Sequence, residues 1–455
     1  MLTARPTLSA TATPEVAAAL PAAPRRGVDA VAFLTFWLAL LVVIPAKLSF
    51  AALGGAGSPA TLTALLAAGW WAWYHVNRSA PTGAGHQPVR IAHLAFVCCV
   101  LVSYVGAMTR PINSAETSTA DLGLLGLIGW TGIILLANDG ITDRARFDVL
   151  VRRLVLAGGF LATIGIIQFV TGDPLVDRIS IPGLTANQSL TGVLSRSGFT
   201  RPAGTAVHPI EFGTVLVMLL PFALTTALTD QRRSALRRWY PVAAISLAVF
   251  FSISRSALIG AVVVLAILVP VWPRGVRIRV LSAVVGLCTV VFLTVPGMIG
   301  TLTGLFTTIS DDSSARSRTE SYALVWEFVA RAPVIGRGFS TFLPGYRILD
   351  NQYLVLLIEV GAVGLAAMLA LLVTGIVVSQ QTRRAARDDA TAQLGQALTA
   401  SIAAGGLSLA LFDGLGFPMS AGMLFFVLGL AGALRRIERT PVRVAEGETD
   451  TFVHP

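Results

Sequence analysis

Apolar runs of the length that a helix needs to cross a lipid bilayer recur along the whole chain. A spanning helix takes ~20 mostly apolar residues, and only helices and closed barrels satisfy their backbone hydrogen bonds inside hydrocarbon. Twelve runs approach this length, at 31–50, 59–76, 89–108, 121–137, 149–171, 207–228, 241–254, 256–272, 280–300, 351–377, 393–412 and 418–434. The sequence therefore predicts an all-α, polytopic membrane helix bundle with about twelve transmembrane helices.

The composition excludes several other classes of protein. Hydrophobic residues make up 54% of the 455 residues and charged residues only 13%, against about 25% charged residues in soluble domains. A soluble enzyme, a disordered chain and a disulfide scaffold are therefore excluded. The cysteines Cys98, Cys99 and Cys288 lie in apolar runs without CxxC or Cys/His spacing, so neither a redox pair nor a zinc site is indicated.

Arginines between the apolar runs predict the orientation of the chain. The net charge is +10, and Lys47 is the only lysine. Short basic clusters between membrane segments fit the positive-inside rule better than a nucleic-acid surface, so we expect no nucleic-acid partner. With the N-terminus in the cytoplasm, every inner connection contains arginine. We therefore expect a multi-pass protein of the cytoplasmic (inner) membrane, surrounded by membrane lipids, with both termini cytoplasmic.

The ends of the chain differ from its apolar middle. Residues 1–28 are rich in Ala, Pro and Thr and are predicted to form a disordered cytoplasmic tail. A transmembrane domain should follow over 29–436, and a cytoplasmic tail over 437–455. The basic pair before the first apolar run is also compatible with a cleaved signal peptide. The run at 31–50 is too long for a 7–15-residue signal core, which favours an uncleaved first helix.

One pair of runs is separated only by a short polar stretch. The pair of runs at 241–254 and 256–272 is interrupted by Ser252, Ser254, Arg255 and Ser256. An arginine inside hydrocarbon costs ~3 kcal/mol or more without a partner. We therefore predict two helices joined by a tight polar turn rather than one continuous helix.

Two outward-facing loops, at about 172–206 and 301–350, are longer than the others. The second contains an amphipathic stretch at 319–330, whose predicted apolar face is made of Tyr322, Val325, Trp326 and Val329. Connections in helix bundles are usually short, and long ordered loops usually carry function. The chemistry is therefore expected on the extracytoplasmic side.

Ten arginines fall in outward-facing segments, where orientation does not require them, and eight of these lie in the two long loops. They are Arg110, Arg178, Arg196, Arg201, Arg255, Arg316, Arg318, Arg331, Arg337 and Arg347. They could pair with nearby acids, namely Asp173, Asp177, Asp311, Asp312 and Glu320, or touch lipid phosphates. Alternatively, some of them form a pocket for a phosphate-bearing substrate, because arginine binds phosphate bidentately and stays charged.

Three groups of residues favour such a pocket. The first runs from Arg201 through Gly204 to His208-Pro209, and His208 is the only histidine in an outward-facing segment. A histidine at a helix start can also be a cap or a packing residue. The second is the turn Ser252-Ile-Ser-Arg255-Ser-Ala, where an arginine at membrane depth is functional by default or lies at the interface with its charge in the headgroups.

The third group ends the second long loop. It comprises Arg318, Pro333-Val-Ile-Gly336-Arg-Gly338, Asp350-Asn351-Gln-Tyr353-Leu and Glu359-Val-Gly-Ala-Val-Gly-Leu. The glycines allow close backbone approach or a positive φ, and Asp350 and Asn351 can cap the incoming helix. Glu359 follows two turns later in an apolar helix, where a carboxylate needs a partner such as arginine.

These motifs, in this order and over roughly residues 120–435, resemble the O-antigen ligase and polymerase family. The resemblance implies a GT-C-like integral-membrane glycosyltransferase. Such enzymes move a glycan from a polyprenyl diphosphate carrier, such as undecaprenyl diphosphate, to a saccharide or lipid-glycan acceptor. The transfer takes place on the outer side of the cytoplasmic membrane and uses no nucleotide sugar.

The sequence departs from the ligases of this family at one position. Ligases usually carry a histidine, proposed as the base, just before the Asn-x-Tyr-Leu run, whereas this chain has Asp350. An aspartate has an ordinary pKa near ~4 and is a weaker base unless desolvation raises that pKa. This favours a polymerase, or a ligase with an unusual acceptor, over a lipid A–core ligase. It also makes His208 an alternative base.

The resemblance implies roles for the residues of these motifs. Arg201, Arg255 and Arg318 are expected to surround the diphosphate, and Asp350 or His208 to deprotonate the acceptor hydroxyl. The supporting residues are Arg316, Asn351, Tyr353, Glu359, Gly336 and Gly338. No metal or cofactor is expected, because arginines supply the positive charge and the loops contain no DxD. A transporter or flippase would instead place its polar residues near the bilayer midplane, and a non-enzymatic scaffold would leave them dispersed.

Overall fold

The computed structural model describes residues 29–77, 86–186, 194–196, 198–307, 322 and 324–439. The α-helices are α1 (Ala30–Val43), α2 (Pro59–Val76), α3 (Pro88–Met108), α4 (Ser114–Gly140), α5 (Arg144–Thr171), α6 (Pro209–Thr229), α7 (Ala235–Phe251), α8 (Arg255–Leu268), α9 (Arg274–Thr294), α10 (Met298–Thr307), α12 (Gln352–Glu359), α13 (Gly361–Ala385), α14 (Asp389–Leu409) and α15 (Pro418–Arg439). A further helical segment covers 324–331. The predicted tail at 1–28 and residues 440–455 lie outside the described part of the chain.

Short elements connect the long helices, and all of them except η3 lie at one end of the helix bundle. The 3₁₀ helices are η1 (Ala51–Gly57), η2 (Val176–Arg178), η3 (Val269–Val271) and η5 (Gly414–Gly416). Strand β1 (Leu48–Ser49) pairs antiparallel with β2 (Thr185–Ala186), and β3 (Ser195–Arg196) with β4 (Phe199–Thr200). The first pair ties the segment after α1 to the segment after α5.

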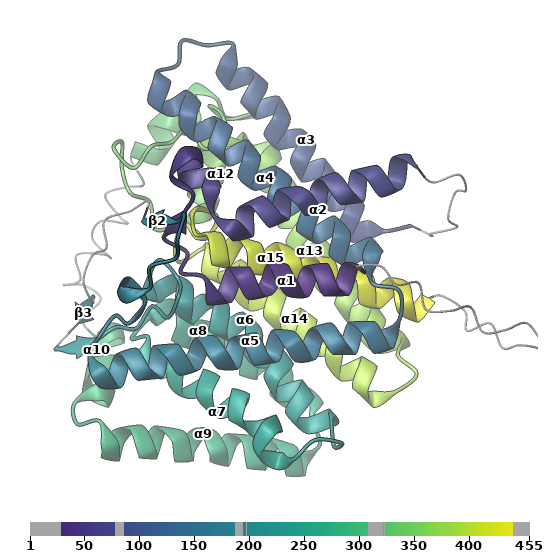
Figure 1. Cartoon of the computed structure of the whole chain (residues 1–455), viewed down its shortest axis with the longest axis vertical. Coiled ribbons are helices and arrows are strands. Elements are labelled where there is room, and N and C mark those ends of the chain that lie inside the picture. The colour runs from purple at the N-terminus through teal and green to yellow at the C-terminus, as the bar shows by residue number, and fades with distance from the viewer. Residues whose placement is uncertain are drawn as a thin grey trace, which may run out of the picture.

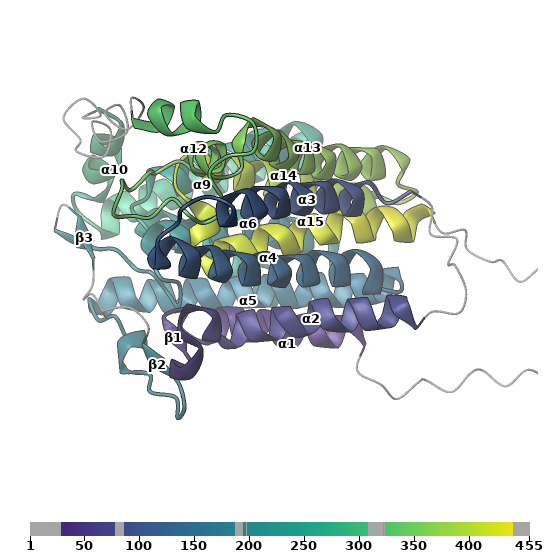
Figure 2. The same cartoon turned by 90° about the horizontal axis from the view of Figure 1, so that it is seen from above.

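The long helices lie side by side, and the chain runs back and forth along the bundle (Figures 1 and 2). We call the end where α1 begins and α15 finishes the terminal end. The opposite end, which we call the loop end, carries the strands, η1, α10 and the connections before α6, α8, α12 and α15 (Figure 2). All the predicted site residues that the structure describes belong to the loop end.

Seven helices are long and apolar enough to cross a membrane, namely α3, α4, α5, α6, α9, α13 and α15. Treating η1 and α2, which are bent by 71°, as one span would add an eighth. Each of the twelve predicted runs contains a helix, but α1 and α8 with η3 are shorter than a full span. The prediction of an all-α, multi-span membrane protein is confirmed, whereas the count of twelve spans stays a prediction.

Three predicted features of the helices differ from the observed structure. Helix α1 ends at Val43 and not near 50, because Pro45 disfavours helical backbone at Ile44, which is extended. The predicted apolar face at 319–330 is only half buried: Val325 and Val329 are buried, whereas Tyr322 and Trp326 are exposed. Residues 319–321 and 323 of that stretch lie outside the described residues.

The third difference is a break in the run predicted at 351–377. Helix α12 ends at Glu359, and Gly361 has a φ of 67°, so the chain changes direction before α13. Segment 333–338 lies along the break: Arg337 N–H donates to the Ile358 carbonyl (2.9 Å) and Gly338 N–H to the Glu359 carbonyl (2.9 Å). Beyond the break, Ala362 N–H donates to the Pro333 carbonyl (2.9 Å). Backbone groups freed by the break are thus paired, as burial requires.

The core lies around α6 and α15, which are the most deeply buried of the candidate spans. By contrast, only 11% of the residues in the apolar stretch of α9 are buried inside the protein. Figure 1 shows α9 at the edge of the bundle. The predicted polar turn between two helices is confirmed: α7 ends at Phe251 and α8 begins at Arg255.

Candidate functional site

Arg201 and the turn before Arg255 meet at the loop end. The Arg201 Nε donates a hydrogen bond to the Ser252 carbonyl (3.3 Å), and its backbone N–H donates to the Leu194 carbonyl (2.8 Å). Ser252 lies three residues before Arg255, the first residue of α8. Two of the three arginines predicted to bind phosphate therefore belong to one corner of the bundle.

The turn between α7 and α8 is strained. Ile253 is fully buried and has a φ of 45°, which a β-branched residue rarely adopts. The Ser252 Oγ donates to the Val249 carbonyl (2.7 Å) and the Ser254 and Ser256 hydroxyls bond to each other (2.8 Å). Strained backbone of this kind persists where the surroundings enforce it and is concentrated at functional sites.

His208 caps α6 beside this turn. Its Nδ1 accepts a hydrogen bond from the Ile210 N–H (3.1 Å), so the cap foreseen as an alternative role is present. Burial, together with the charges of Arg201 and Lys47, lowers the pKa of His208 to about 4. At neutral pH the ring is therefore uncharged, with its Nδ1 engaged and its proton on Nε2.

Lys47 is a cation of this corner that sequence reasoning missed. Ala46 N–H donates to the Thr205 carbonyl (2.8 Å), and the Thr205 hydroxyl donates to the Val42 carbonyl (2.6 Å), which fixes the segment after α1 against the one before α6. Lys47 and Arg201 line the same pocket of about 70 Å³. The signal available in the sequence was that Lys47 is the only lysine of the chain.

Glu211 joins the start of α6 to the start of α15. Its fully buried carboxylate accepts hydrogen bonds from the backbone N–H groups of Val207 (2.8 Å), Met419 (2.7 Å) and Ser420 (3.2 Å). A carboxylate at helix N-termini is stabilised by the unpaired amides and by the helix dipole. Glu211 therefore fixes the position of His208 relative to the loop before α15.

The loop before α15 also contacts the segment that contains the Asp350-Asn351 motif. Asn351 caps α12, because its Oδ1 accepts from the N–H groups of Tyr353 (3.0 Å) and Leu354 (3.3 Å), and the predicted capping role is confirmed. The Tyr353 hydroxyl donates to the Gly406 carbonyl of α14 (2.6 Å). Gln352 N–H donates to the Phe412 carbonyl (3.3 Å) and its side chain accepts from Leu415 N–H (2.9 Å).

These bonds bring Asp350 near Asp413. Burial, and then the charge of Asp350, raise the pKa of Asp413 to about 6. Asp413 and Glu359 line a pocket of about 250 Å³. The ring of Phe417, four residues after Asp413, lies 6.2 Å from the ring of His208. The acidic corner and the basic corner therefore adjoin through the loop before α15.

Glu359 is held in a way that differs from the arginine pairing expected from sequence. The Phe342 N–H donates to its carboxylate (3.1 Å), and its carbonyl accepts from the Ser103 hydroxyl (2.6 Å). Gly336 and Gly338 have positive φ angles of 71° and 126° and lie against α12 and α3, where a Cβ would collide with the Glu359 backbone and with Ala107. The predicted close approach and positive φ of both glycines are confirmed.

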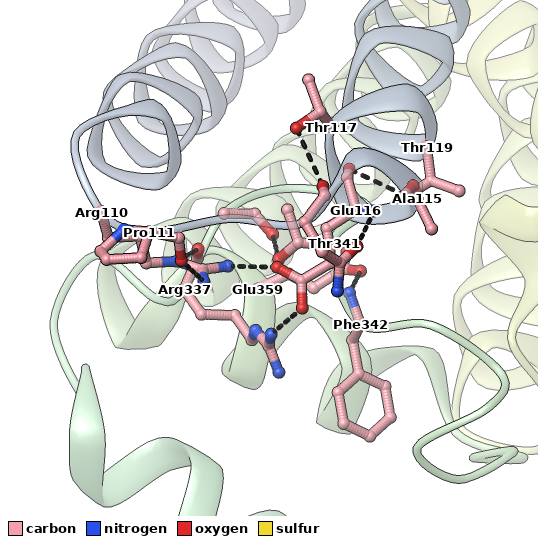
Figure 3. A network of polar contacts seen from close by, with 12 residues as sticks. Arg110, Pro111, Ala115, Glu116, Thr117, Thr119, Arg337, Thr341, Phe342 and Glu359 are labelled. Atoms are coloured by element: carbon pink, nitrogen blue, oxygen red, sulfur yellow. Dashed lines mark hydrogen bonds and ion pairs between the residues drawn. The ribbon is translucent and has the colours of Figure 1, made fainter.

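Arg337, which lies nearest to Glu359, pairs with a different acid. Its Nη2 bonds to Glu116 Oε1 (2.6 Å), while Glu116 Oε2 accepts from Arg110 (2.9 Å), as Figure 3 shows. The Tyr346 hydroxyl also donates to Glu116. Glu116 therefore locks the segment after α3 to the loop that supports Glu359. Sequence reasoning missed it, because an acid near a helix start is usually an exposed N-terminal residue.

The outer arginines thus divide between the two roles considered. Arg110 and Arg337 pair with Glu116, and Arg178 pairs with Asp173, which is the acid-pairing role, although Glu116 was not among the expected partners. Arg201 and Arg255 belong to the corner near His208. Arg316 and Arg318, with Asp311, Asp312 and Glu320, lie outside the described residues, and the part of Arg318 in the site stays a prediction.

The lowered pKa of His208 predicts how stability depends on pH. The folded protein takes up a proton at His208 only near pH 4, whereas the unfolded chain does so near the ordinary value of 6.5. Between these values the unfolded state binds more protons, so stability falls as the pH is lowered through this window. His208 should therefore lower the unfolding temperature at about pH 5 relative to pH 7, whereas the raised pKa of Asp413 acts in the opposite direction. The contribution of His208 is measured by intrinsic fluorescence in detergent, as the difference in pH dependence between wild type and a variant without this histidine.

His208→Asn keeps a capping side chain and should reduce this pH dependence. The matched control is His86→Asn, which removes an exposed histidine next to the terminal end and should leave the dependence unchanged. Equal pH slopes for wild type and His208→Asn would contradict the assignment.

Comparison with known proteins gives one result that bears on this site. Residues 240–369 match a family model described as O-antigen ligase. The match includes the turn at 252–254, Arg255, segment 333–338 and Asp350-Asn351, and it ends before α14; Arg201 and His208 lie on its N-terminal side. No curated protein matches the chain. The match confirms the resemblance seen in the motifs and supports assignment of the chain to the O-antigen ligase and polymerase family.

Proposed function

We propose that this multi-pass membrane protein is a GT-C-like glycosyltransferase that polymerises or ligates polyprenyl-diphosphate-linked saccharides on the outer face of the cytoplasmic membrane. The observation that carries the proposal is the meeting of Arg201, Lys47, His208 and the turn before Arg255 at the loop end. This cationic corner adjoins Asp350 and Asp413 through the loop before α15. Polymerase activity is favoured over ligase activity, because Asp350 replaces the histidine usual in ligases.

The charges of the corner suit a diphosphate. The described residues that line its pocket include Arg201 and Lys47, and none of them is acidic. Arg255 begins the helix that follows the bonded turn. Guanidinium groups bind phosphate oxygens bidentately, and such groups stabilise the charge that develops on a leaving diphosphate. Arg318 is proposed to complete this set from the second long loop.

The proposed reaction is a displacement at the anomeric carbon of the donor sugar. The acceptor hydroxyl transfers its proton to a base and its oxygen forms the new glycosidic bond. The bond from the anomeric carbon to the diphosphate oxygen breaks, and polyprenyl diphosphate leaves with the electron pair. Arg201, Arg255 and Arg318 hold the negative charge that accumulates on it, while the polyprenyl tail lies between helices in contact with lipid.

Asp350 is the favoured base, and His208 is the alternative. The Nδ1 of His208 already accepts a backbone hydrogen bond, and the neighbouring Arg201 and Lys47 oppose its protonation. Asp350 lies beside Asp413, whose pKa is raised to about 6. The Asp413 carboxyl therefore holds a proton at a higher pH than an ordinary aspartate does.

Replacement of the base gives a direct prediction. Asp350→Asn should lower the rate of transfer by about 10²–10⁴, the usual contribution of general base catalysis, without preventing donor binding. His208→Asn, which keeps the cap, should lower it less. The measurement is the turnover of purified variants with a saturating polyprenyl-diphosphate oligosaccharide. Full activity of Asp350→Asn would exclude Asp350 as the base and leave the diphosphate site untouched.

The function itself is tested by reconstitution in proteoliposomes with a polyprenyl-diphosphate oligosaccharide. Chain growth on the carrier identifies a polymerase, and transfer to a separate saccharide or lipid-glycan acceptor identifies a ligase. A transporter or flippase would move the labelled lipid across the bilayer and form no glycosidic bond, which would refute the proposal. The position of the ionisable groups at the loop end, rather than in the middle of the bundle, favours the enzyme.

A further inference from the structure

A second basic pocket lies at the terminal end, away from the proposed catalytic site. It has a volume of about 290 Å³ and is formed where α6 ends and where α7, α9 and α14 begin. The side chains that bear on its chemistry are Gln231, Arg238, Trp239, Trp272, Arg279 and Gln393. Among the described residues, the lining contains two arginines and no acidic residue, so the pocket favours an anion.

Arg238 is fixed in this pocket by neutral groups, and no acidic side chain among the described residues forms an ion pair with it. Its Nη1 donates to the Ala227 carbonyl at the end of α6 (3.1 Å) and to the side-chain oxygen of Gln231 (2.7 Å). Both partners are neutral, and the buried Nε has no hydrogen-bond partner among the residues that the structure describes. Among the described residues, the guanidinium of Arg238 is therefore bonded only to neutral groups, and an anion in the pocket could supply the opposite charge.

Two further side chains complete a site for a phosphate with an attached hydroxyl. The Arg279 Nε donates to the Gly275 carbonyl of its own helix (3.1 Å), which leaves its two Nη atoms available at the exposed rim. Gln393 also lines the pocket, and its buried Oε1 accepts no hydrogen bond from the described residues. The pocket thus offers guanidinium donors and one unused acceptor.

The surroundings of the pocket fit a lipid. Trp239 and Trp272 lie in its wall, and tryptophan is enriched at the headgroup level of membranes. Beyond the pocket, α9 exposes Ile278, Leu281 and Val285 along its length. Acyl chains can therefore follow this apolar helix while the headgroup occupies the pocket.

We infer that this pocket binds the phosphoglycerol headgroup of an anionic phospholipid. The phosphate contacts Arg238 and Arg279, and a glycerol hydroxyl donates to Gln393. Basic pockets between transmembrane helices bind anionic headgroups in this way. The inference rests on this pocket alone and does not depend on the proposed transferase activity.

The test is native mass spectrometry of the purified full chain in detergent, with phosphatidylglycerol or phosphatidylcholine added at equal concentration. Phosphatidylglycerol should bind more tightly, and Arg279→Gln should weaken its binding about tenfold, since a hydrogen bond to a charged group contributes ~1.5–3 kcal/mol. Arg279 lies on the exposed side of α9, so the variant should fold. Arg237→Gln removes the same charge next to Arg238 but outside the pocket and should bind phosphatidylglycerol as wild type does.

Gln393→Leu provides a second test, because it removes the proposed hydrogen-bond acceptor and keeps a side chain of similar volume. It should weaken phosphatidylglycerol more than phosphatidic acid, which lacks the glycerol hydroxyl. Equal binding of phosphatidylglycerol by Arg279→Gln and Arg237→Gln would overturn the site. Displacement of the lipid by an equal concentration of free glycerol phosphate would overturn the assignment to a lipid.

Discussion

Alanine in place of Arg201 is expected to lower the rate of glycan transfer by about 10²–10³, the usual effect of removing one group that stabilises developing charge. The same loss is expected for Arg255→Ala, because both arginines are proposed to hold the leaving diphosphate. The measurement is polymer formation by proteoliposomes that contain each purified variant. The loss should appear in kcat rather than in KM, since the charge on the diphosphate grows as the sugar leaves.

The controls for this prediction come from the same end of the protein. Arg178→Ala removes an outer arginine that is mostly exposed and pairs with Asp173; such surface pairs contribute ~0–1 kcal/mol, so transfer should be unchanged. Arg201→Lys keeps the charge but not the bidentate geometry and should retain an intermediate rate. Full polymer formation by correctly folded Arg201→Ala and Arg255→Ala would refute the diphosphate site.

Gly336→Ala is expected to destabilise the protein by ~3 kcal/mol or more, at the upper end of single substitutions. A Cβ at this position would collide with the backbone of Glu359, and the φ of 71° is unfavourable for alanine. Relief of the collision requires segment 333–338 to separate from the break between α12 and α13. The loss is measured as a fall in the thermal unfolding temperature and in the yield of monodisperse protein.

Gly345→Ala is the matched control in the same loop. A Cβ on Gly345 would meet nothing within 4 Å, and its φ is not positive. This variant should be as stable as wild type. Similar unfolding temperatures for the two variants would show that the backbone pairing of 333–338 with the break contributes little.

Much of the helical architecture could be predicted from local sequence. Apolar length alone located a helix in each run, and Ser252, Ser254 and Arg255 marked the turn between α7 and α8 because a charged residue opposes a continuous helix in hydrocarbon. The capping role of Asn351 also followed from local rules. These features depend on residues close together in the chain.

The break at Val360 could not be predicted, because it is stabilised from a distance. Segment 333–338 forms hydrogen bonds with the backbone groups that a continuous helix would pair internally. The residues at 351–377 contain no signal that such a partner exists. For the same reason the acid partner of Arg110 and Arg337 was missed: Glu116 joins residues more than 200 positions apart.

The sequence predicted which residues belong to the site better than it predicted the contacts between them. His208 was selected because it is the only histidine in an outward-facing segment, and Arg201 and Arg255 because they lie in polar motifs next to apolar helices. Lys47 and Asp413 were not, since each lies in a segment without a motif, and only the fold brings them to the same end. Long-range proximity is the information that one sequence lacks.

The hydrogen bonds of Glu211 also have a consequence for how the protein is made. The chain enters the membrane from its N-terminus, so α6 is inserted long before α15, and the N–H groups of Met419 and Ser420 are the last to arrive. Until then Glu211 accepts a hydrogen bond from only one of its three backbone donors, the N–H group of Val207. The start of α6, including His208, is not yet fixed to the start of α15. A nascent chain that ends between residues 360 and 417 would thus contain every predicted site residue and still lack two of the hydrogen bonds that hold Glu211, so we expect the proposed site to form only when synthesis is nearly complete.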